Sequence, residues 1–375
     1  MGVPLLQDAA PALAVAVVSL VLYVGFRAPS VRVLFFSAMA YIKGVPIVWI
    51  DAPALAAKAL KASSSKGIFL ERILSEPAWL PVISLESVDD PLWSSMKNNL
   101  TLLLKALPSA SALESITARI TDTYLAEHEI LDSNSVVYIT VAAFYEWIFA
   151  KAFPDDANFV CDSTWEWRKE LALKGKANVA LKQRVVDWII GEVKATPAIY
   201  NLFGAKWEEP AYFSLLLQPF FLSPAINVSD VAVTMGSLVH CHGLVDESIS
   251  DLINKALDMA HPFVIVERFL EHGLAADDVT IAPGTHVFIP MDIMTSDNTI
   301  RFGAGARKCP GQHQGMALML GLFQRHVLLS PKFQPALHHK YSGRDQDGQE
   351  TLPELLYQVA LIVSVFWTAL KHRFL

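Results

Sequence analysis

One cysteine stands in a glycine-rich, basic loop toward the C-terminal end of the sequence. The stretch reads RFGAGARKCPG, Arg301 to Gly311, and an apolar segment with helical spacing follows it. The other two cysteines, Cys161 and Cys241, lie far from Cys309, and no CxxC spacing occurs. The cysteines therefore indicate free thiols, as in a reducing compartment, rather than a disulfide framework.

The residue types around Cys309 suit a thiolate that binds a metal. A thiolate stays deprotonated when cations and backbone N–H groups face it, and a helix that starts just after it supplies N–H groups and a positive dipole end. Gly303, Gly305 and Gly311 let the backbone turn and approach a flat ligand closely. Arg307 is placed to reach an anionic group on that ligand.

The complete loop resembles the FxxGxRxCxG haem loop of cytochromes P450. Phe302-Gly-Ala-Gly305-Ala-Arg307-Lys-Cys309-Pro-Gly311 meets every fixed position of that motif. The resemblance implies haem b as cofactor and Cys309 as the axial ligand of its iron. Phe302 is then expected to pack beside the sulfur and keep it dry. The alternative is a structural loop with a buried thiol.

Two further segments are similar to the same family. Trp93-Ser-Ser-Met-Lys97 resembles the family's WxxxR helix, with a lysine that keeps the charge but loses the planar fork of arginine. Arg268 falls where the family has another arginine for a haem propionate. The resemblance thus implies that Trp93, Lys97, Arg268 and Arg307 hold the cofactor. A core aromatic at Trp93 and a solvated surface charge at Arg268 are the alternatives.

The sequence departs from the family's ExxR motif, which does not occur in the chain. The matching positions read Lys255-Ala-Leu-Asp258, with the charges inverted. Side chains three residues apart on a helix can form a salt bridge, but ordinary surface charges are the favoured interpretation.

The family's acid–alcohol pair for oxygen activation also lacks a clean match. The candidate helix begins at Ser223, and Ser229, Asp230 and Thr234 are its candidate catalytic residues. For Ser229-Asp230 a helix N-cap is the favoured alternative. A proton relay is therefore the part of an oxygenase interpretation with the least support.

Apolar spacing predicts the elements that must position these residues. Helices are expected over 92–106, 113–129, 136–152, 165–193 and 228–260. Short strands are expected at 47–50, 279–281 and 286–289, with a turn at 282–285. The predicted fold class is mainly α with a small β part, and the haem loop implies the cytochrome P450 fold.

The N-terminus carries a candidate transmembrane helix. Residues 9–26 are eighteen residues without a charge, just long enough to cross a bilayer, and basic residues follow them, which keeps the rest of the chain cytoplasmic. We expect residues 1–30 to form a single-pass anchor, with a hinge at Pro29–Arg32, and 31–375 to form a P450-like haem domain. Residues 335–375 match the family poorly. A buried core helix is the alternative for 9–26.

Composition and the remaining motifs narrow the function further. The 375-residue chain carries a formal net charge of −7 with scattered basic residues, so nucleic-acid binding is not expected. His240-Cys241-His242 is a poor metal cluster, because adjacent side chains on a helix diverge. His338-His339 is predicted to be solvated, and the apolar run 355–370 is predicted to be core or membrane-interfacial.

Three functions fit these observations. The favoured one is a haem-thiolate monooxygenase in the endoplasmic reticulum membrane, facing the cytosol, that oxidises an apolar small molecule in a secondary metabolite pathway. Its electrons would come from NADPH through a cytochrome P450 reductase, whose acidic surface Lys308 and Arg325 would suit. The second is haem-thiolate rearrangement, dehydration, cyclisation or peroxide-dependent chemistry, which the missing ExxR favours. The third is a non-enzymatic relative without haem, favoured by an apparent deletion after Pro290.

Overall fold

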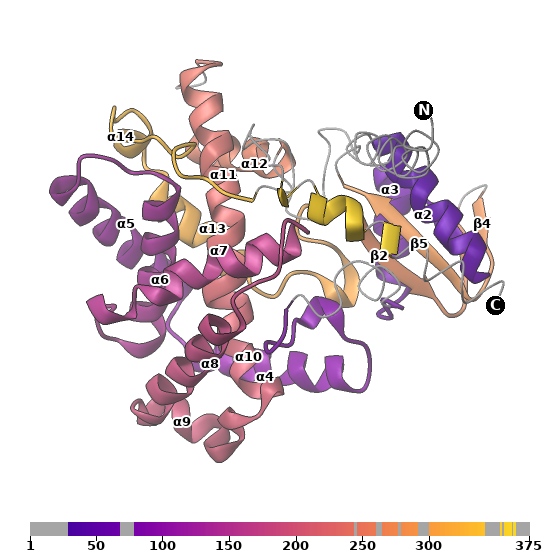
Figure 1. Ribbon diagram of the computed structural model, residues 1–375, viewed down its shortest axis with the longest axis horizontal. Helices are drawn as coiled ribbons and strands as arrows, with labels where there is room; N and C mark the ends of the chain where they lie inside the picture. The colour runs from indigo at the N-terminus through magenta and orange to yellow at the C-terminus, as the bar shows by residue number, and fades with distance from the viewer. Residues whose placement is uncertain are drawn as a thin grey trace, which may run out of the picture.

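A computed structural model shows how the chain folds. It describes residues 29–67, 79–243, 246–259, 265–276, 279–291, 300–341, 353–354, 356–361 and 363–364. Most helices form one part of the molecule, and the strands lie beside it with the first two described helices (Figure 1). The predicted anchor at 9–26 and half of the apolar run at 355–370 lie outside the described residues.

The helical part confirms three of the five predicted helices closely. Its helices are α4 (Leu92–Ala106), α5 (Ala110–Glu127), α6 (Ser133–Phe149), α7 (Phe159–Leu171), α8 (Val179–Lys194), α9 (Pro197–Phe203), α10 (Pro210–Leu216), α11 (Ser223–His240), α12 (Ile249–Met259), α13 (Gln312–Leu322) and α14 (Arg325–Leu328). The two longest predictions are wrong, because each region forms two helices. Leu173 and Gly243 have positive φ angles of 59° and 65°, which end a right-handed helix.

The strands form a three-stranded sheet and a separate pair. In the sheet, β5 (Thr285–Pro290) lies between β1 (Ile47–Trp49), which runs parallel to it, and β2 (Ile265–Leu270), which runs antiparallel. β3 (Leu274–Ala276) pairs with β4 (Val279–Ile281). All six residues of β5 are buried, as expected of a central strand. The predicted strands at 47–50, 279–281 and 286–289 are thus confirmed.

Two helices accompany the sheet, α2 (Pro29–Lys43) and α3 (Pro53–Ala62). The hinge predicted at 29–32 is wrong, since α2 begins at Pro29, a position where a helix tolerates proline. On the sheet side of α2, the ring of Phe36 lies 6.4 Å from that of Trp49 and 6.2 Å from that of Phe288. This aromatic cluster fixes α2 against β1 and β5.

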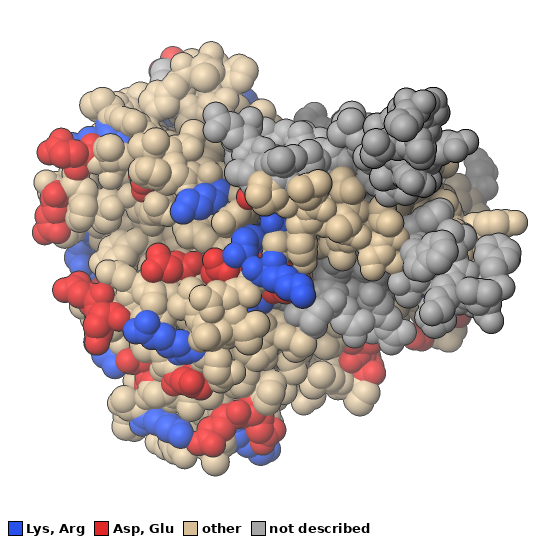
Figure 2. All heavy atoms as spheres, viewed as in Figure 1, with Lys and Arg blue, Asp and Glu red and all other residues tan. Residues whose placement is uncertain are grey.

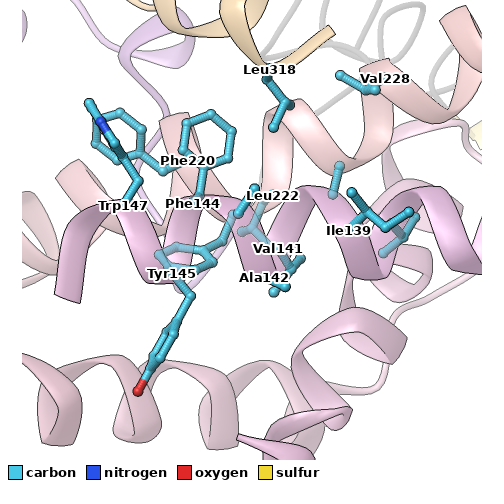
Figure 3. Close-up of a cluster of buried hydrophobic side chains, with 14 of the residues drawn as sticks. Ile139, Val141, Ala142, Phe144, Tyr145, Trp147, Phe220, Leu222, Val228 and Leu318 are labelled. Atoms are coloured by element: carbon cyan, nitrogen blue, oxygen red, sulfur yellow. The ribbon is translucent and has the colours of Figure 1, made fainter. Parts of the chain in front are cut away.

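A long helix over residues 210–240 crosses the helical part. It consists of α10, the π-helical segment η5 (Leu217–Leu222) and α11. Pro219 and Pro224 have no N–H to donate to the carbonyls four residues before them, which accounts for the wider turn. Phe220 packs on α6, with ring centroids 5.6 Å from Phe144 and 5.8 Å from Trp147 (Figure 3).

Within the described residues, this helix is also the one that meets the length and composition of a membrane span. About half of its most apolar window, 56%, is buried inside the molecule. A core helix has the same character, and the α6 contacts show that much of the apolar surface of this helix is used in packing.

The position of α13, which follows Cys309, depends on a close helix crossing. A Cβ atom at Gly321 of α13 would lie 2.5 Å from the carbonyl oxygen of Glu114 and 2.8 Å from Cβ of Thr117, both on α5. Only glycine allows this approach, so α5 fixes α13 and with it the end of the cysteine loop.

The surface shown in Figure 2 carries both signs of charge. Lys and Arg side chains are interspersed with Asp and Glu side chains over the helical part of this face. Such a mixed surface does not select a strongly charged partner there.

Candidate functional site

The cysteine loop, residues 301–311, is a closed turn before α13. The backbone N–H of Cys309 donates to the carbonyl of Phe302 at 2.7 Å. Gly303 and Gly305 have φ angles of 73° and 68°, in the left-handed region that favours glycine. The sequence prediction that these two glycines let the loop turn is consistent with this backbone.

Gly305 and Gly311 have different structural roles in the loop. Gly305 begins the short 3-10 turn η6 (Gly305–Arg307) and touches α3, where a Cβ atom would lie 2.5 Å from the carbonyl oxygen of Leu60. Gly311 has a φ of −93°, so the freedom predicted for it is not used. No described atom lies within 4 Å of where its Cβ would be, which leaves open space two residues after Cys309.

Cys309 is an exposed residue, although protein atoms surround its sulfur on most sides. This burial raises the pKa of Cys309 above its ordinary value, against the lowering effects of the Gly311 N–H and the Lys308 charge, and the Glu86 carboxylate raises it further. The loop by itself therefore does not keep the sulfur deprotonated, contrary to prediction. Phe302 is half-buried against the helical core, and it does not keep Cys309 dry, since Cys309 is an exposed residue.

We expect the Cys309 thiol of the cofactor-free protein to react with iodoacetamide slowly at neutral pH. The rate should rise with a midpoint above that of free cysteine, because the thiolate is the nucleophile. Mass spectrometry of peptides separates Cys309 from the exposed Cys241, which serves as the internal reference. A midpoint at or below that of free cysteine would contradict the raised pKa.

Helix α4 brings two predicted cofactor residues to the loop. Trp93 is buried, and its ring centroid lies 4.9 Å from Nζ of Lys97 and 4.5 Å from the guanidinium carbon of Arg307. Lys97 Nζ also donates to the carbonyl of Ala306 in η6. The structure thus gathers Trp93, Lys97 and Arg307, which are far apart in sequence, beside the cysteine loop.

Arg268 on β2 is a buried cation with an unsatisfied donor. Its side chain is fully buried, and its Nη1 donates to the Glu267 carbonyl at 2.7 Å. Its Nε has no hydrogen-bond partner among the described residues. Burial lowers the pKa of Arg268, Glu86 and Asp89 raise it, and the Arg307 charge lowers it. A solvated surface position, the alternative for Arg268, is therefore wrong.

The inverted charges on α12 do not pair with each other. Lys255 pairs with Glu247, whereas Asp258 accepts from both Nε and Nη2 of Arg301, the latter at 2.6 Å. Asp258 is therefore not an ordinary surface charge, since its bidentate pair ties α12 to the first residue of the cysteine loop. Sequence reasoning had no signal for this link beyond the acid itself, because its partner is 43 positions away.

The candidate catalytic residues of α11 lie in a buried cluster with Arg168 of α7. Arg168 donates from Nη1 to Oγ of Ser229 at 2.8 Å and pairs with Asp230, whose Oδ1 lies 3.1 Å from Nε2 of His339. Burial acts to raise the pKa of Asp230, but Arg168 and His339 outweigh it, so the pKa is lowered. Thr234 donates to the carbonyl of Asp230 at 3.1 Å.

This cluster corrects two interpretations. Ser229 lies in the middle of α11, six residues after its start, so the Ser229-Asp230 pair is not an N-cap. The His339 side chain is 2% exposed, so it is not solvated as predicted, whereas His338 is exposed and pairs with Asp132. The described residues contain no group of three or more His, Cys, Asp or Glu side chains placed to hold a metal ion.

Comparison with known proteins places this geometry in a fold. No protein-family model matches the chain, and no curated protein matches its sequence. The crystal structure of a cytochrome P450 from Thermus thermophilus matches with a TM-score of 0.58 at 16% identity, over 86% of this chain and 91% of that one. An open form of cytochrome P450 EryK from S. erythraea matches with a TM-score of 0.53 at 15% identity, over 80% and 88%.

A third match is a variant of cytochrome P450 OleT in complex with arachidonic acid, with a TM-score of 0.57 at 12% identity over 76% of this chain and 81% of that one. The chain has the cytochrome P450 fold. The predicted class, mainly α with a small β part, is confirmed. At these identities the likeness establishes the P450 fold alone, so the chemistry of the site has to follow from the residues of this chain.

Proposed function

We propose that this chain is a haem-thiolate monooxygenase that oxidises an apolar small molecule. One observation carries the proposal: in a P450 fold, the exposed residue Cys309 stands in a loop that meets every fixed position of FxxGxRxCxG. No described side chain crowds the position of a Cβ at Gly311, two residues after Cys309. Cys309 would be the axial ligand of haem b iron.

Two cations, the buried Arg268 and the partly exposed Lys97, fit the two carboxylates of haem. Arg268 has a buried Nε without a partner among the described residues, and an unpaired buried donor is costly unless an acceptor reaches it. Lys97 lies beside the loop and packs on Trp93. We assign Arg268 and Lys97 to the carboxylates and Trp93 to fixing the position of Lys97.

Bound haem would supply an iron at which oxygen can be activated, with the thiolate donating electron density. The chain's part begins with the proton on Cys309, which must leave because the thiolate is the ligand. Burial raises the pKa of Cys309, so the fraction of thiolate increases with pH. The affinity of the protein for haem iron should therefore also increase with pH. The Gly311 N–H, which acts on the sulfur in the same sense as a cation, favours the charged form.

The substrate class and partners belong to the same proposal. The chain is 53% hydrophobic, and a structural neighbour was solved with a fatty acid, which supports an apolar substrate. Lys308 and Arg325 are exposed and suit an acidic NADPH-dependent reductase. Location in the endoplasmic reticulum membrane rests on the apolar run at 9–26, and a secondary metabolite pathway is our choice among apolar substrates.

A second candidate is haem-thiolate chemistry without reductase, such as rearrangement, dehydration, cyclisation or a peroxide-dependent reaction. Arg168 donates to Ser229 and pairs with Asp230, so these side chains are committed to the cluster rather than available for proton delivery. Turnover that needs neither NADPH nor reductase would favour this candidate over the monooxygenase.

The absorption spectrum of the reduced, carbon monoxide-bound protein tests both candidates. We expect the full-length chain, purified in detergent, to show the strongly red-shifted Soret band of thiolate-ligated haem, and Cys309→Ser to lose it. Cys241→Ser is the matched control and should keep the band. A band at the normal position would contradict the proposal, and a folded protein that takes up no haem would identify the chain as a non-enzymatic relative.

A further inference from the structure

Arg307 is the loop arginine that the family resemblance assigns to a ligand carboxylate, but the protein itself encloses it. Its side chain is 0% exposed. Nε donates to the carbonyl of Ser64, Nη1 donates to that of Leu85 at 3.1 Å, and Nη2 donates to that of Val88 at 2.9 Å. Three backbone acceptors from two separate segments therefore surround the guanidinium.

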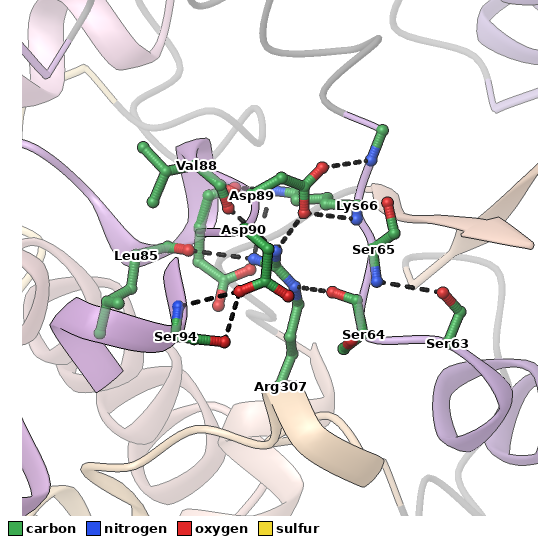
Figure 4. A network of polar contacts seen from close by, with 12 residues as sticks. Ser63, Ser64, Ser65, Lys66, Leu85, Val88, Asp89, Asp90, Ser94 and Arg307 are labelled. Atoms are coloured by element: carbon green, nitrogen blue, oxygen red, sulfur yellow. Dashed lines mark hydrogen bonds and ion pairs between the residues drawn. The ribbon is translucent and has the colours of Figure 1, made fainter. Parts of the chain in front are cut away.

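Asp89 adds a charged partner that is itself held in place. Its carboxylate pairs with Nη2 of Arg307 and also accepts from the N–H groups of Lys66 and Gly67, each at 2.9 Å. Figure 4 shows this carboxylate between residues 63–67 and the guanidinium of Arg307. Gly67 has a φ of 71°, and a Cβ there would collide with the His286 ring, so its N–H direction depends on glycine.

The remaining face of Arg307 is also covered. Its guanidinium carbon lies 4.5 Å from the centroid of the buried Trp93 ring. A cofactor carboxylate that took the place of Asp89 would have to displace a group that already combines an ion pair with two backbone hydrogen bonds. Arg268 offers a buried donor that needs no such displacement.

We propose that Arg307 is a positioning residue: it holds the Cys309 loop to residues 63–67 and 85–89 through Asp89, and does not contact a cofactor carboxylate. The claim that Arg307 does not contact a cofactor carboxylate rests on the proposed function. The Arg307–Asp89 pair can be tested in the cofactor-free chain, so the two can fail separately.

Titration of the full-length chain with hemin and with hemin dimethyl ester, which lacks both carboxylates, tests the assignment. In the wild type, hemin should bind more tightly than the diester. Arg307→Gln should weaken both ligands by the same factor and leave their affinity ratio unchanged. Arg268→Gln should weaken hemin by about tenfold, as for a lost charge-assisted contact, and leave the diester nearly unaffected.

The cofactor-free chain tests the pair directly. Asp89→Asn and Arg307→Gln should lower the unfolding midpoint by similar amounts, the double variant should lower it little further, and Asp89→Glu should restore part of the loss. Arg119→Gln, which breaks an exposed pair with Glu146, is the control and should have little effect.

A spectroscopic readout separates positioning from general stability. After loading with hemin, Asp89→Asn should show a smaller fraction of the red-shifted carbon monoxide band per bound haem, because Cys309 is less well placed. An unchanged fraction would overturn a positioning role. A hemin-to-diester ratio that falls to one in Arg307→Gln would overturn the assignment by showing a carboxylate contact. If the wild type binds no hemin, the proposed function fails. Unequal decreases in the unfolding midpoint of cofactor-free Asp89→Asn and Arg307→Gln would still overturn the proposed interaction between Arg307 and Asp89.

Discussion

Replacement of Arg168 by methionine is expected to destabilise the protein by about 3–5 kcal/mol, the usual cost of leaving a buried charge without its partner. Arg168 is 3% exposed and supports Asp230, Ser229 and the carbonyls of Ile226 and Tyr341. Its loss releases α7 from α11 and from the segment that contains Tyr341. Denaturant unfolding followed by far-ultraviolet circular dichroism measures the change.

The stability loss of Arg168→Met should depend on pH through the ionisation of Asp230. The pKa of Asp230 is lowered in the folded protein, so its contribution to stability is present above the pKa of an unfolded aspartate and is lost as pH falls through the folded value. Without Arg168, burial would raise that pKa, and the variant's deficit should shrink toward acid pH as Asp230 becomes neutral. A deficit that is constant with pH, or no recovery in Arg168→Met/Asp230→Asn, would argue against an uncompensated charge.

Gly305→Ala is expected to destabilise the protein by about 2–5 kcal/mol and to weaken hemin binding. The left-handed backbone costs about 1–2 kcal/mol for a residue with a Cβ. Overpacking against the Leu60 carbonyl, 2.5 Å from that Cβ, adds about 1–3 kcal/mol. The new methyl group must push η6 from α3 and displace the cysteine loop. Thermal unfolding of the cofactor-free protein and a hemin titration measure the two effects.

Gly303→Ala is the matched control, since it has a similar φ of 73° but its Cβ would lie 3.6 Å from the nearest atom, the carbonyl oxygen of Arg307. It should cost only the conformational term, about 1–2 kcal/mol. Equal losses in the two variants would show that contact with α3 does not decide the position of the loop.

Local sequence patterns determined part of the elements and the identity of the candidate site. Apolar periodicity predicted α4 at its observed bounds and the strands β1, β4 and β5 within one residue of theirs. A segment that buries one face has apolar residues at regular spacing, so its position can be predicted from the sequence. The cysteine loop was found for the same reason: its glycines and Cys309 act through local backbone geometry, within eleven consecutive residues.

Only the tertiary structure decided which charges meet. Arg307 with Asp89, Asp258 with Arg301, and Arg168 with Asp230 are pairs separated by 43 to 218 positions in the chain. A charge has no periodic signal, and its role depends on whether folding buries it and on what acceptors surround it. The sequence therefore indicated where a haem thiolate could stand. Packing decided that Arg307 is enclosed, that Arg268 is buried with an Nε that has no hydrogen-bond partner among the described residues, and that the Cys309 pKa is raised by the protein around it.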